Sequence, residues 1–431
     1  TQGYTMTPLI IIGPGFTGGR LFSPTTKRPG LVTNTDVAPT ILAFLGLPVP
    51  AEAAGRPLKV RPAADVYTAL STEEARLTTA AFWQQPILKF FTVFLDGLFI
   101  CCVLALLWPE LPWRRFLRRL LLLATVIPLA LLITPIPTNP WPFLPFFLGV
   151  LVVLYGFFLF AGRDRPLFLI CLGTTGAILV DQFLGAPLAK RALLSYSPLA
   201  GARFYGLGNE YMGVLLGSSL MATGYAYARW RGRRWLLPGL LAFFVLLAFV
   251  LVMPGLGTNV GGFLAAAVGF GMAIPAFAEK KVARRNLLLY FGAAFAFLIL
   301  LGILDSLRPT HSQTHLGRLV AAMRTGGFGP FWEVARRKLA MNFKLIRFSG
   351  WSRVVFFALL GMAITAVFPP ERGLRAVRAH PAMMKALWAS LAAAAGALAF
   401  NDSGIVAAGT LIVFPAAAWF DLLLVEHPPD G

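Results

Sequence analysis

Long runs of apolar residues alternate with short polar connections from about residue 87 to the end of the chain. Each run is close to the roughly 20 residues that an α-helix needs to cross the hydrocarbon core of a bilayer. Because lipid offers the backbone no hydrogen-bond partners, apolar runs of this length must be helical. The pattern predicts eleven membrane-spanning helices, at residues 88–108, 120–135, 143–161, 166–184, 209–227, 235–253, 260–278, 286–305, 353–369, 382–400 and 404–424.

The composition agrees with this pattern. Hydrophobic residues make up 57% of the chain, charged residues 13%, and the mean hydropathy is +0.72. These values are typical of integral membrane proteins and not of soluble domains. We therefore expect an all-α polytopic membrane protein preceded by a small extracytoplasmic α/β unit. Its predicted divisions are 1–62 for that unit, 63–87 for a mixed linker with a short helix near Ser71, and 88–424 for the membrane domain with a long outer loop at 306–352.

The net charge of +20 is unevenly distributed along the chain. Lys and Arg lie in every second connection between apolar runs, at 114–119, 163–165, 229–234, 280–285 and 372–385. Positive charge near the ends of spans is retained in the cytoplasm. The charge thus predicts cytoplasmic connections and a cytoplasmic C-terminus, with the N-terminus outside, and gives no reason to expect a nucleic-acid partner.

The first 62 residues differ from the rest of the chain. "TPLIIIGPG", beginning at Thr7, predicts a buried strand that ends in a Gly/Pro turn. "DVAPTILAFLG" predicts a helix with Thr35 or Asp36 as N-cap and Gly46 at its end. One strand and one helix cannot bury a core of useful size alone.

The order "TPLIIIGPG", "GLVTNTDVAPTILAFLGLPVP" and "GRPL" resembles the C-terminal end of the alkaline-phosphatase superfamily, which includes sulfatases, phosphoglycerate mutases and type I phosphodiesterases. The resemblance implies a remnant of the hydrolase fold. The metal ligands and the nucleophile of that family would lie upstream, since residues 1–62 contain no His. With no export signal in view, we expect an upstream phosphatase-like domain in a longer protein. The alternative is a small cap of unrelated origin.

Four polar motifs lie in the connections predicted to be external. "SPLAGARFYGLGNEYMG" places Arg203, Tyr205, Asn209 and Glu210 within eight residues at a membrane boundary, where such groups are costly unless they pair with each other or with a ligand. A structural turn in which Arg203 and Glu210 satisfy one another is the equal alternative. "PGLGTNVGG", with Asn259, favours a tight helical hairpin over a cavity lining.

The third motif is the long loop at 306–352. His311 and His315 lie four residues apart, which is a weak zinc pattern without a third ligand, so no metal site is predicted. The basic and aromatic residues that follow, among them Arg318 and Arg337, predict an amphipathic helix on the membrane surface. Such a helix could bind an anion or simply rest on anionic lipid.

The fourth motif is "FNDSG", which places Asn401, Asp402 and Ser403 in a short link between the last two spans. Asp402 joins three other carboxylates near the same boundary: Asp181, Glu210 and Asp305. If the four converge, they could bind a cation, relay a proton or serve as general base. If they do not converge, each is an ordinary residue at a helix end.

The motifs "GARFYGLGNEYMG", "LGTNVGG", "HLGR…RRKLAMNFKLIRFSGWS" and "NDSGIVAAGT" together resemble an uncharacterised group of bacterial polytopic proteins, in which the membrane region follows an exported phosphatase-like domain. The resemblance implies a bacterial plasma membrane but supplies no reaction and no cofactor. The first functional hypothesis is an enzyme-like module for an anionic, lipid-linked substrate of the cell envelope. Its candidate catalytic residues are Glu210, His315 and Asp402, and its candidate binding residues are Arg203, Tyr205, Asn209, Asn259, Arg318, Arg337, Asn401 and Ser403.

Two other functional hypotheses remain open at this point. One is a membrane anchor for an exported phosphatase or phosphodiesterase-like domain, although a single helix would suffice for anchoring. The other is a proton- or cation-coupled transporter that uses the four carboxylates. The predicted span interiors are mostly Leu, Val, Phe and Ala, which counts against the transporter.

Overall fold

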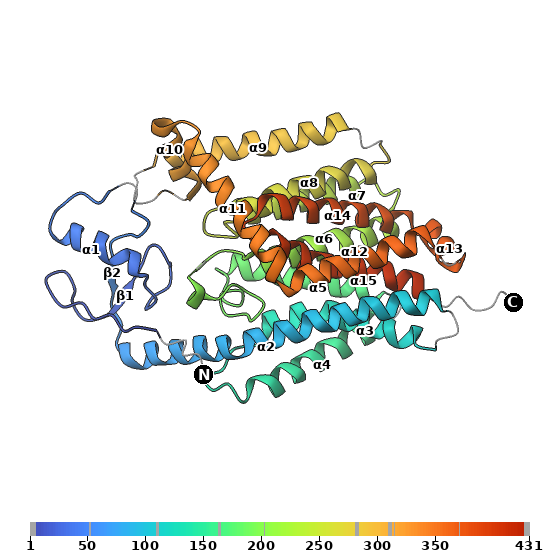
Figure 1. Ribbon diagram of the computed structural model, residues 1–431, viewed down its shortest axis with the longest axis horizontal. Coiled ribbons are helices and arrows are strands. Elements are labelled where there is room, and N and C mark those ends of the chain that lie inside the picture. Colours follow the sequence, from blue (N-terminus) through green and yellow to red (C-terminus); the bar gives the residue numbers. More distant parts are fainter. Residues whose placement is uncertain are drawn as a thin grey trace.

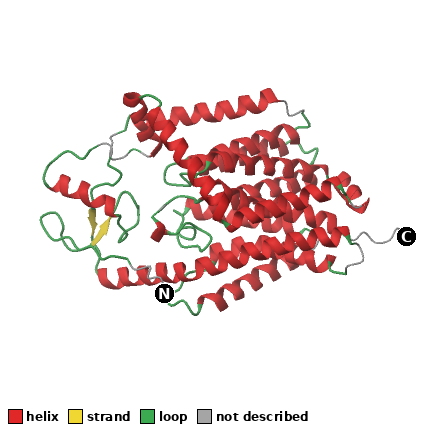
Figure 2. Ribbon diagram, in the orientation of Figure 1, coloured by secondary structure: helices red, strands yellow, loops and turns green. Residues whose placement is uncertain are grey.

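Figure 1 shows a computed structural model of the protein, in which a small N-terminal unit lies at one end of a bundle of long helices. The structure describes residues 6–50, 53–108, 112–162, 165–201, 203–280, 284–308, 313, 315–369 and 371–425. Helices dominate it, and the strands are confined to the N-terminal unit (Figure 2). We call the end of the bundle nearest that unit the N-terminal face.

Each of the eleven predicted spans lies in a helix. The helices are α2 Val66–Leu107, α3 Arg114–Ile133, α4 Phe143–Gly162, α5 Pro166–Phe183, α6 Asn209–Trp230, α7 Leu236–Val252, α8 Val260–Phe277, α9 Arg284–Ser306, α12 Gly350–Val367, α14 Pro381–Phe400 and α15 Gly404–Leu424. Among the described residues, nine helices are long and apolar enough to cross a membrane. The nine include neither α7, which has 17 residues, nor α6. A multi-pass membrane protein is therefore supported, while the count of eleven stays a prediction.

Helix α6 lies at the centre of the bundle, packed against α14 and α15. Its polar residues Ser218, Ser219 and Thr223 are buried and bond to carbonyls one turn earlier, so they need no aqueous partner. Gly213 and Gly217 lie directly against the backbone of α15, where a Cβ would collide with a carbonyl oxygen. This spacing of small residues lets two membrane helices approach closely.

The outer helices of the bundle expose apolar side chains instead of polar ones. On α4, Val152 is 69%, Val153 70% and Phe160 77% exposed. In water, such a surface would strongly favour aggregation. Surrounded by hydrocarbon, the same side chains are in their preferred solvent, so this surface fits a membrane-embedded bundle.

Ion pairs gather at the end of the bundle opposite the N-terminal face. Arg118 of α3 pairs with Asp421 of α15 at 2.8 Å. Glu279, just after α8, pairs with Arg231 and lies 3.8 Å from Lys385. Three of the five basic connections predicted to be cytoplasmic, those of Arg118, Arg231 and Lys385, thus contribute to ion pairs at this end of the bundle.

The N-terminal unit contains β1 Arg20–Phe22, the short 3-10 helix η1 Asn34–Asp36, α1 Val37–Phe44 and β2 Lys59–Arg61. The two strands pair antiparallel, with Leu21 opposite Val60. Helix α1 confirms the helix predicted here, and Gly46 adopts a φ of +68° just after its end.

The Asp36 carboxylate holds this unit together. It is fully buried and accepts hydrogen bonds from the Ser23 and Thr25 hydroxyls, both at 2.6 Å, and from the backbone amides of Thr33 and Arg56. These four donors outweigh the effect of burial, which would raise its pKa, and keep the pKa of Asp36 below its ordinary value. Hydrogen bonds to one buried carboxylate thus connect the segments of this unit, which is too short to build a large apolar core.

The buried strand predicted from Thr7 onward is wrong. Residues 7–12 form no strand or helix, and Ile10 and Ile12 are 80% and 91% exposed. An apolar run becomes a buried strand only where another layer covers it, and the described residues provide none here. Instead, this run and α1 border an open apolar groove of about 240 Å³, lined by Leu9, Ile11, Ile12, Gly13, Phe16, Val37, Thr40, Ile41, Phe44 and Leu45.

The segment predicted as a mixed linker, 63–87, largely belongs to α2, a helix of 42 residues. The Asp65 side chain caps its start by accepting from the Thr68 amide at 3.0 Å. No Gly or Pro interrupts residues 66–85, and Pro86 lies within the helix. The first half of α2 is anchored by tertiary contacts, since Gln84 donates to the Leu193 and Ser195 carbonyls.

Candidate functional site

Polar side chains from three separate connections meet at the N-terminal face. The amide of Asn209, at the start of α6, donates to Oδ1 of Asp402 at 2.8 Å and to the hydroxyl of Ser403 at 2.6 Å. Asp402 and Ser403 lie in the turn between α14 and α15. We use the term polar cluster for the six side chains that lie together here: Arg203, Asn209, Asn259, Lys338, Asp402 and Ser403.

Asn259 joins the connection between α7 and α8 to this cluster. Its side-chain oxygen accepts from the Gly262 amide at 2.7 Å and so caps α8. Its amide nitrogen donates to the oxygen of Asn209 and to the Leu207 carbonyl, each at 3.0 Å. The tight hairpin favoured from the sequence is thus also a support that fixes the orientation of Asn209.

Arg203 and Glu210 do not form the mutual pair considered from the sequence. Arg203 donates to the Leu207 carbonyl instead. Glu210 lies in the first turn of α6, with its carboxylate close to Gly208, where a negative charge stabilises the helix N-terminus. Arg203 is only half-buried, so its remaining donors are available at the surface of the cluster.

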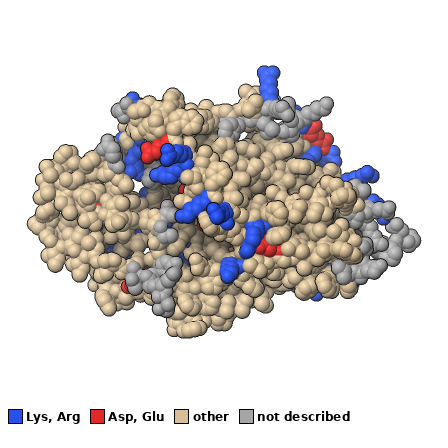
Figure 3. All heavy atoms as spheres, viewed as in Figure 1, with Lys and Arg blue, Asp and Glu red and all other residues tan. Residues whose placement is uncertain are grey.

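The long loop forms two helices, α10 His315–Gly326 and α11 Gly329–Phe348. Helix α11 runs across the N-terminal face (Figure 1), with Phe331, Trp332 and Phe343 exposed. Most basic and aromatic residues of the loop therefore lie on helices, while their position on a membrane surface stays a prediction. Figure 3 shows patches of Lys and Arg on the visible face of the molecule. On α11, Arg336, Arg337, Lys344 and Arg347 are exposed.

Two residues on the inner side of α11 were missed as site residues. Lys338 donates to the Phe400 carbonyl at 3.3 Å. Asn342 donates to the Asn401 carbonyl at 2.6 Å and accepts from the Gly404 amide at 2.8 Å. The only sequence signal was their spacing of four, which places both on one side of a helix. Together they fasten α11 over the turn that carries Asp402.

Asn401 has a structural position next to the cluster. It is buried, its amide donates to the Ala397 carbonyl at the end of α14, and its side chain packs against Gly261. Any side chain at position 261 would collide with it. Asn401 therefore shapes the turn, and its burial leaves almost none of it exposed to a ligand.

The charged groups of the cluster shift each other's pKa values. Protein packed around the carboxylate raises the pKa of Asp402, but the hydrogen bond from Asn209 and the charges of Lys338 and Arg203 outweigh this, so the pKa lies below its ordinary value. Burial lowers the pKa of Lys338, Asp402 raises it, and Arg203 and Arg337 lower it further, with a net lowering. Asp402 therefore stays ionised at neutral pH, and its charge favours the protonated form of Lys338.

Only two of the four carboxylates come close together. Asp181 accepts from the Leu188 and Ala189 amides at 2.7 and 3.1 Å and so shapes the loop after α5. Asp305 accepts from the Gly317 amide at the junction of α9 and α10. Glu210 and Asp402 remain near each other. Within the described residues, no group of three or more His, Cys, Asp or Glu is arranged to hold a metal.

The remaining candidates lie around the cluster. Burial raises the pKa of Tyr205, and the charges of Arg203 and Arg318 oppose this rise, so both arginines act electrostatically on its hydroxyl. Arg337 is exposed beside Lys338. His315 begins α10, but its side chain, like the whole of His311, lies outside the described residues.

The N-terminal unit docks beside the same cluster. Arg28, which is buried, donates to the Phe204 carbonyl at 3.0 Å and to the Lys190 carbonyl at 2.6 Å. The ammonium of Lys27 lies 4.0 Å from the centre of the Tyr205 ring, within range of a cation–π contact. The N-terminal unit is therefore attached to the bundle next to Tyr205, two residues from Arg203 of the polar cluster.

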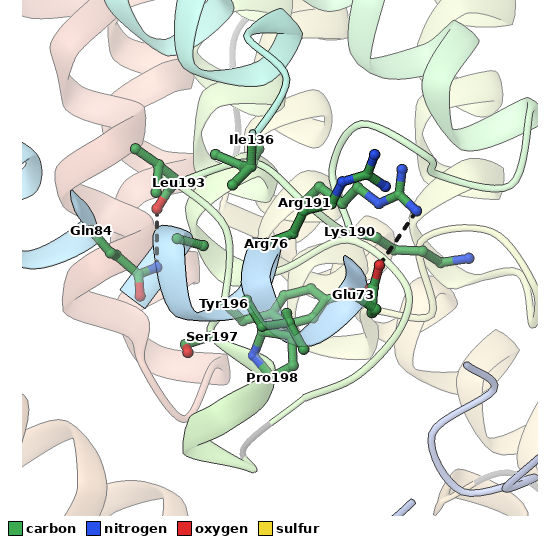
Figure 4. Close-up of a pocket in the computed structure, with 13 residues that line it drawn as sticks. Glu73, Arg76, Gln84, Ile136, Lys190, Arg191, Leu193, Tyr196, Ser197 and Pro198 are labelled. Atoms are coloured by element: carbon green, nitrogen blue, oxygen red, sulfur yellow. Dashed lines mark hydrogen bonds and ion pairs between the residues drawn. The ribbon is translucent and has the colours of Figure 1, made fainter. Parts of the chain in front are cut away.

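A cavity nearby is too small for a substrate. It lies between the first half of α2 and the loop after α5, where Arg76, Lys190 and Arg191 gather around Glu73 (Figure 4). Glu73 pairs with Arg191 at 3.6 Å. The volume of this cavity, about 30 Å³, is enough for water but not for a metabolite. We therefore place the candidate site at the open polar cluster.

No protein-family model, no curated protein and no solved structure matches this chain.

Proposed function

We propose that this chain is an integral membrane protein of a bacterial cell envelope whose polar cluster binds an anionic, lipid-linked substrate at the outer leaflet. The sidedness of charge supports the orientation. The ion-paired, Arg-rich connections lie at one end of the bundle, where the positive-inside rule favours the cytoplasm. The polar cluster lies at the other end, and eleven spans would connect the two.

One observation carries the proposal: Lys338 and Arg203 lie beside an ionised Asp402 that is itself held by Asn209. A preorganised pair of cations at a membrane surface is suited to a phosphate group. Arg318 and Arg337 lie at the edge of the same surface and extend the positive charge. The exposed aromatic residues of α11 suit the interface where the lipid part of such a ligand would begin.

The roles within this proposal follow from the contacts. Arg203, Lys338 and the outer arginines would hold phosphate oxygens. Asp402 acts on Lys338 through its charge, and its lowered pKa makes it a weak base and so a poor proton acceptor. Glu210 is the better candidate for accepting a proton, since it lies next to Asp402 without the hydrogen bond that Asn209 gives that residue. His315 stays a candidate from the sequence.

The binding experiment uses the full chain in nanodiscs and a fluorescent polyprenyl phosphate. Arg203→Gln and Lys338→Gln should each weaken binding about tenfold, the loss typical of one charge-assisted hydrogen bond. The matched control is Arg324→Gln, an exposed arginine of α10. If the wild-type chain does not bind the lipid, or if the control weakens binding as much as the two variants, the proposal is wrong.

A second candidate function is supported by the apolar groove of the N-terminal unit. A groove of about 240 Å³ next to exposed Ile10 and Ile12 suits another α/β layer, such as a phosphatase-like domain that the membrane bundle would anchor. Replacing residues 88–424 by a single apolar helix in the cell tests this candidate. An unchanged envelope phenotype would favour the anchor, and a lost phenotype would favour a role for the bundle itself. The dispersed carboxylates give no comparable support to a coupled transporter.

A further inference from the structure

The small cavity between the first half of α2 and the loop after α5 has an excess of positive charge in its lining (Figure 4). Its charged lining residues are Glu73 and Arg76 from α2, and Lys190 and Arg191 from the loop. Three cations thus surround a single carboxylate. A hollow lined mainly by one sign of charge concentrates ions of the opposite sign. The lining of this cavity therefore favours an anion over a cation or a neutral molecule.

The ion pair in this cavity is loose. A guanidinium nitrogen of Arg191 lies 3.6 Å from a carboxylate oxygen of Glu73, which is longer than a hydrogen bond between such groups. The side chains of Arg76 and Lys190 form neither an ion pair nor a hydrogen bond with the part of the chain that the structure describes. Their donors can therefore form charge-assisted hydrogen bonds with an anion in the cavity.

Tertiary hydrogen bonds hold the loop that forms one wall of the cavity. Gln84 of α2, which also lines the cavity, donates to the Leu193 and Ser195 carbonyls at 3.0 and 2.8 Å. From the N-terminal unit, Arg28 donates to the Lys190 carbonyl at 2.6 Å. The loop is thus fixed on both sides of its two cations. Like charges that are held close together repel each other, and an anion between them offsets this repulsion.

The size of the cavity selects the kind of anion. Its volume of about 30 Å³ has room for about one water molecule. Chloride is a single atom close to a water molecule in size, whereas a phosphate group carries four oxygens and needs more space. The cavity therefore suits a monatomic halide ion.

We propose that this cavity binds a chloride ion, held by Arg76, Lys190 and Arg191, and that the ion fastens the first half of α2 to the loop after α5. The site is separate from the polar cluster and independent of the proposed function. Tyr196, which lines the cavity, donates its hydroxyl to the Gly206 carbonyl at 3.3 Å. The bound ion therefore also stabilises the segment that leads into the polar cluster.

The test measures chloride binding by broadening of the chloride NMR signal, with the full chain in detergent and gluconate as the other anion. The wild-type chain should broaden the signal. Arg76→Gln should weaken binding about tenfold, the loss typical of one charge-assisted hydrogen bond. Glu73→Gln should tighten binding, since it removes the carboxylate that competes with the ion for Arg191. Lys89→Gln is the matched control, because it removes an exposed cation of the same helix outside the cavity.

A second readout is thermal unfolding at one ionic strength. Chloride should raise the melting temperature of the wild-type chain by a few degrees relative to gluconate, because it binds the folded state. Arg76→Gln should lose this gain, and Lys89→Gln should keep it. Equal melting temperatures of the variants in gluconate verify that they are folded. If Arg76→Gln does not fold, Glu73→Gln decides alone, since a folding defect cannot tighten binding.

Three results overturn the chloride site. The first is a wild-type chain that does not broaden the signal. The second is an equal loss in Arg76→Gln and Lys89→Gln, which would mean that chloride binds surface charges elsewhere. The third is binding that Glu73→Gln weakens or leaves unchanged.

Inorganic phosphate, added as competitor, tests the size of the site. It should displace chloride only at a much higher concentration, and displacement at an equal concentration would overturn the assignment of a monatomic ion. The proposed function stands or fails separately, because its test measures a different ligand and substitutes residues of the polar cluster.

Discussion

The side-chain amide of Asn209 lies 2.8 Å from the carboxylate of Asp402, although 193 residues separate them in the chain. This hydrogen bond connects the start of α6 to the turn between α14 and α15. The same amide group of Asn209 accepts from Asn259 at its oxygen, so a third connection depends on it. Asn209 is thus the residue through which the polar cluster is assembled.

Asn209→Ala should destabilise the folded protein by about 1–3 kcal/mol, because it leaves the Asn259 amide and the Asp402 carboxylate without their common partner. The measurement is thermal unfolding of the purified protein in detergent. Gln85→Ala is the control, since it removes an exposed amide from α2. Equal melting temperatures for the two variants would show that Asn209 contributes no more than a surface residue.

The charge of Asp402 should make the stability of the cluster depend on pH. Its pKa is lower in the folded protein than the ordinary value of 3.8, so its contribution is fully present at neutral pH. That contribution shrinks as the pH falls below the ordinary value and is lost once the pH passes the lower, folded-state pKa. We therefore expect the wild-type protein to melt above Asp402→Asn at pH 7 and the difference to close below about pH 4. A difference that stays constant from pH 7 to pH 3 would assign the stabilisation to the shape of the side chain and not to its charge.

Gly217→Ala should destabilise the bundle by about 1–3 kcal/mol, the usual cost of inserting a methyl group where there is no room. The added Cβ would collide with the Leu411 carbonyl on α15 and force α6 and α15 apart. Gly149→Ala on α4 is the matched control, because nothing lies within 4 Å of its Cβ position. Unfolding in a denaturing detergent compares the two. A stability of Gly217→Ala equal to that of the control would contradict the close packing of α6 against α15.

Arg28→Ala should release the N-terminal unit from the bundle without unfolding the bundle. The substitution removes two charge-assisted hydrogen bonds, to the Phe204 and Lys190 carbonyls. Amide hydrogen exchange should rise by about tenfold or more in residues 20–31 and 188–205, since each such bond contributes about 1.5–3 kcal/mol. Exchange in α6 and α15 should not change. Lys59→Ala, at an exposed position of the same unit, serves as control, and an equal rise in both variants would refute the role of Arg28.

The helices of the bundle could be predicted from the sequence because lipid leaves an apolar run of sufficient length only one backbone structure. The closeness of Asn209, Asn259 and Asp402 could be expected only as a shared boundary, and the structure adds the hydrogen bonds that join them. Lys338 and Asn342 were missed because the inner side of an amphipathic surface helix is decided by what lies beneath it. The strand from Thr7 was wrong for a similar reason, since burial depends on a second layer.

Helix α2 has a mechanical consequence for the whole molecule. Its 42 residues measure about 63 Å at about 1.5 Å per residue, roughly twice the thickness of the hydrocarbon core. The first half of the helix is held by Gln84, which donates to the Leu193 carbonyl, and by Trp83, which donates to the Pro140 carbonyl. If the proposed membrane placement is right, the length of α2 would fix the distance between the N-terminal unit and the lipid surface, in the way that a rigid spacer does and a flexible linker does not.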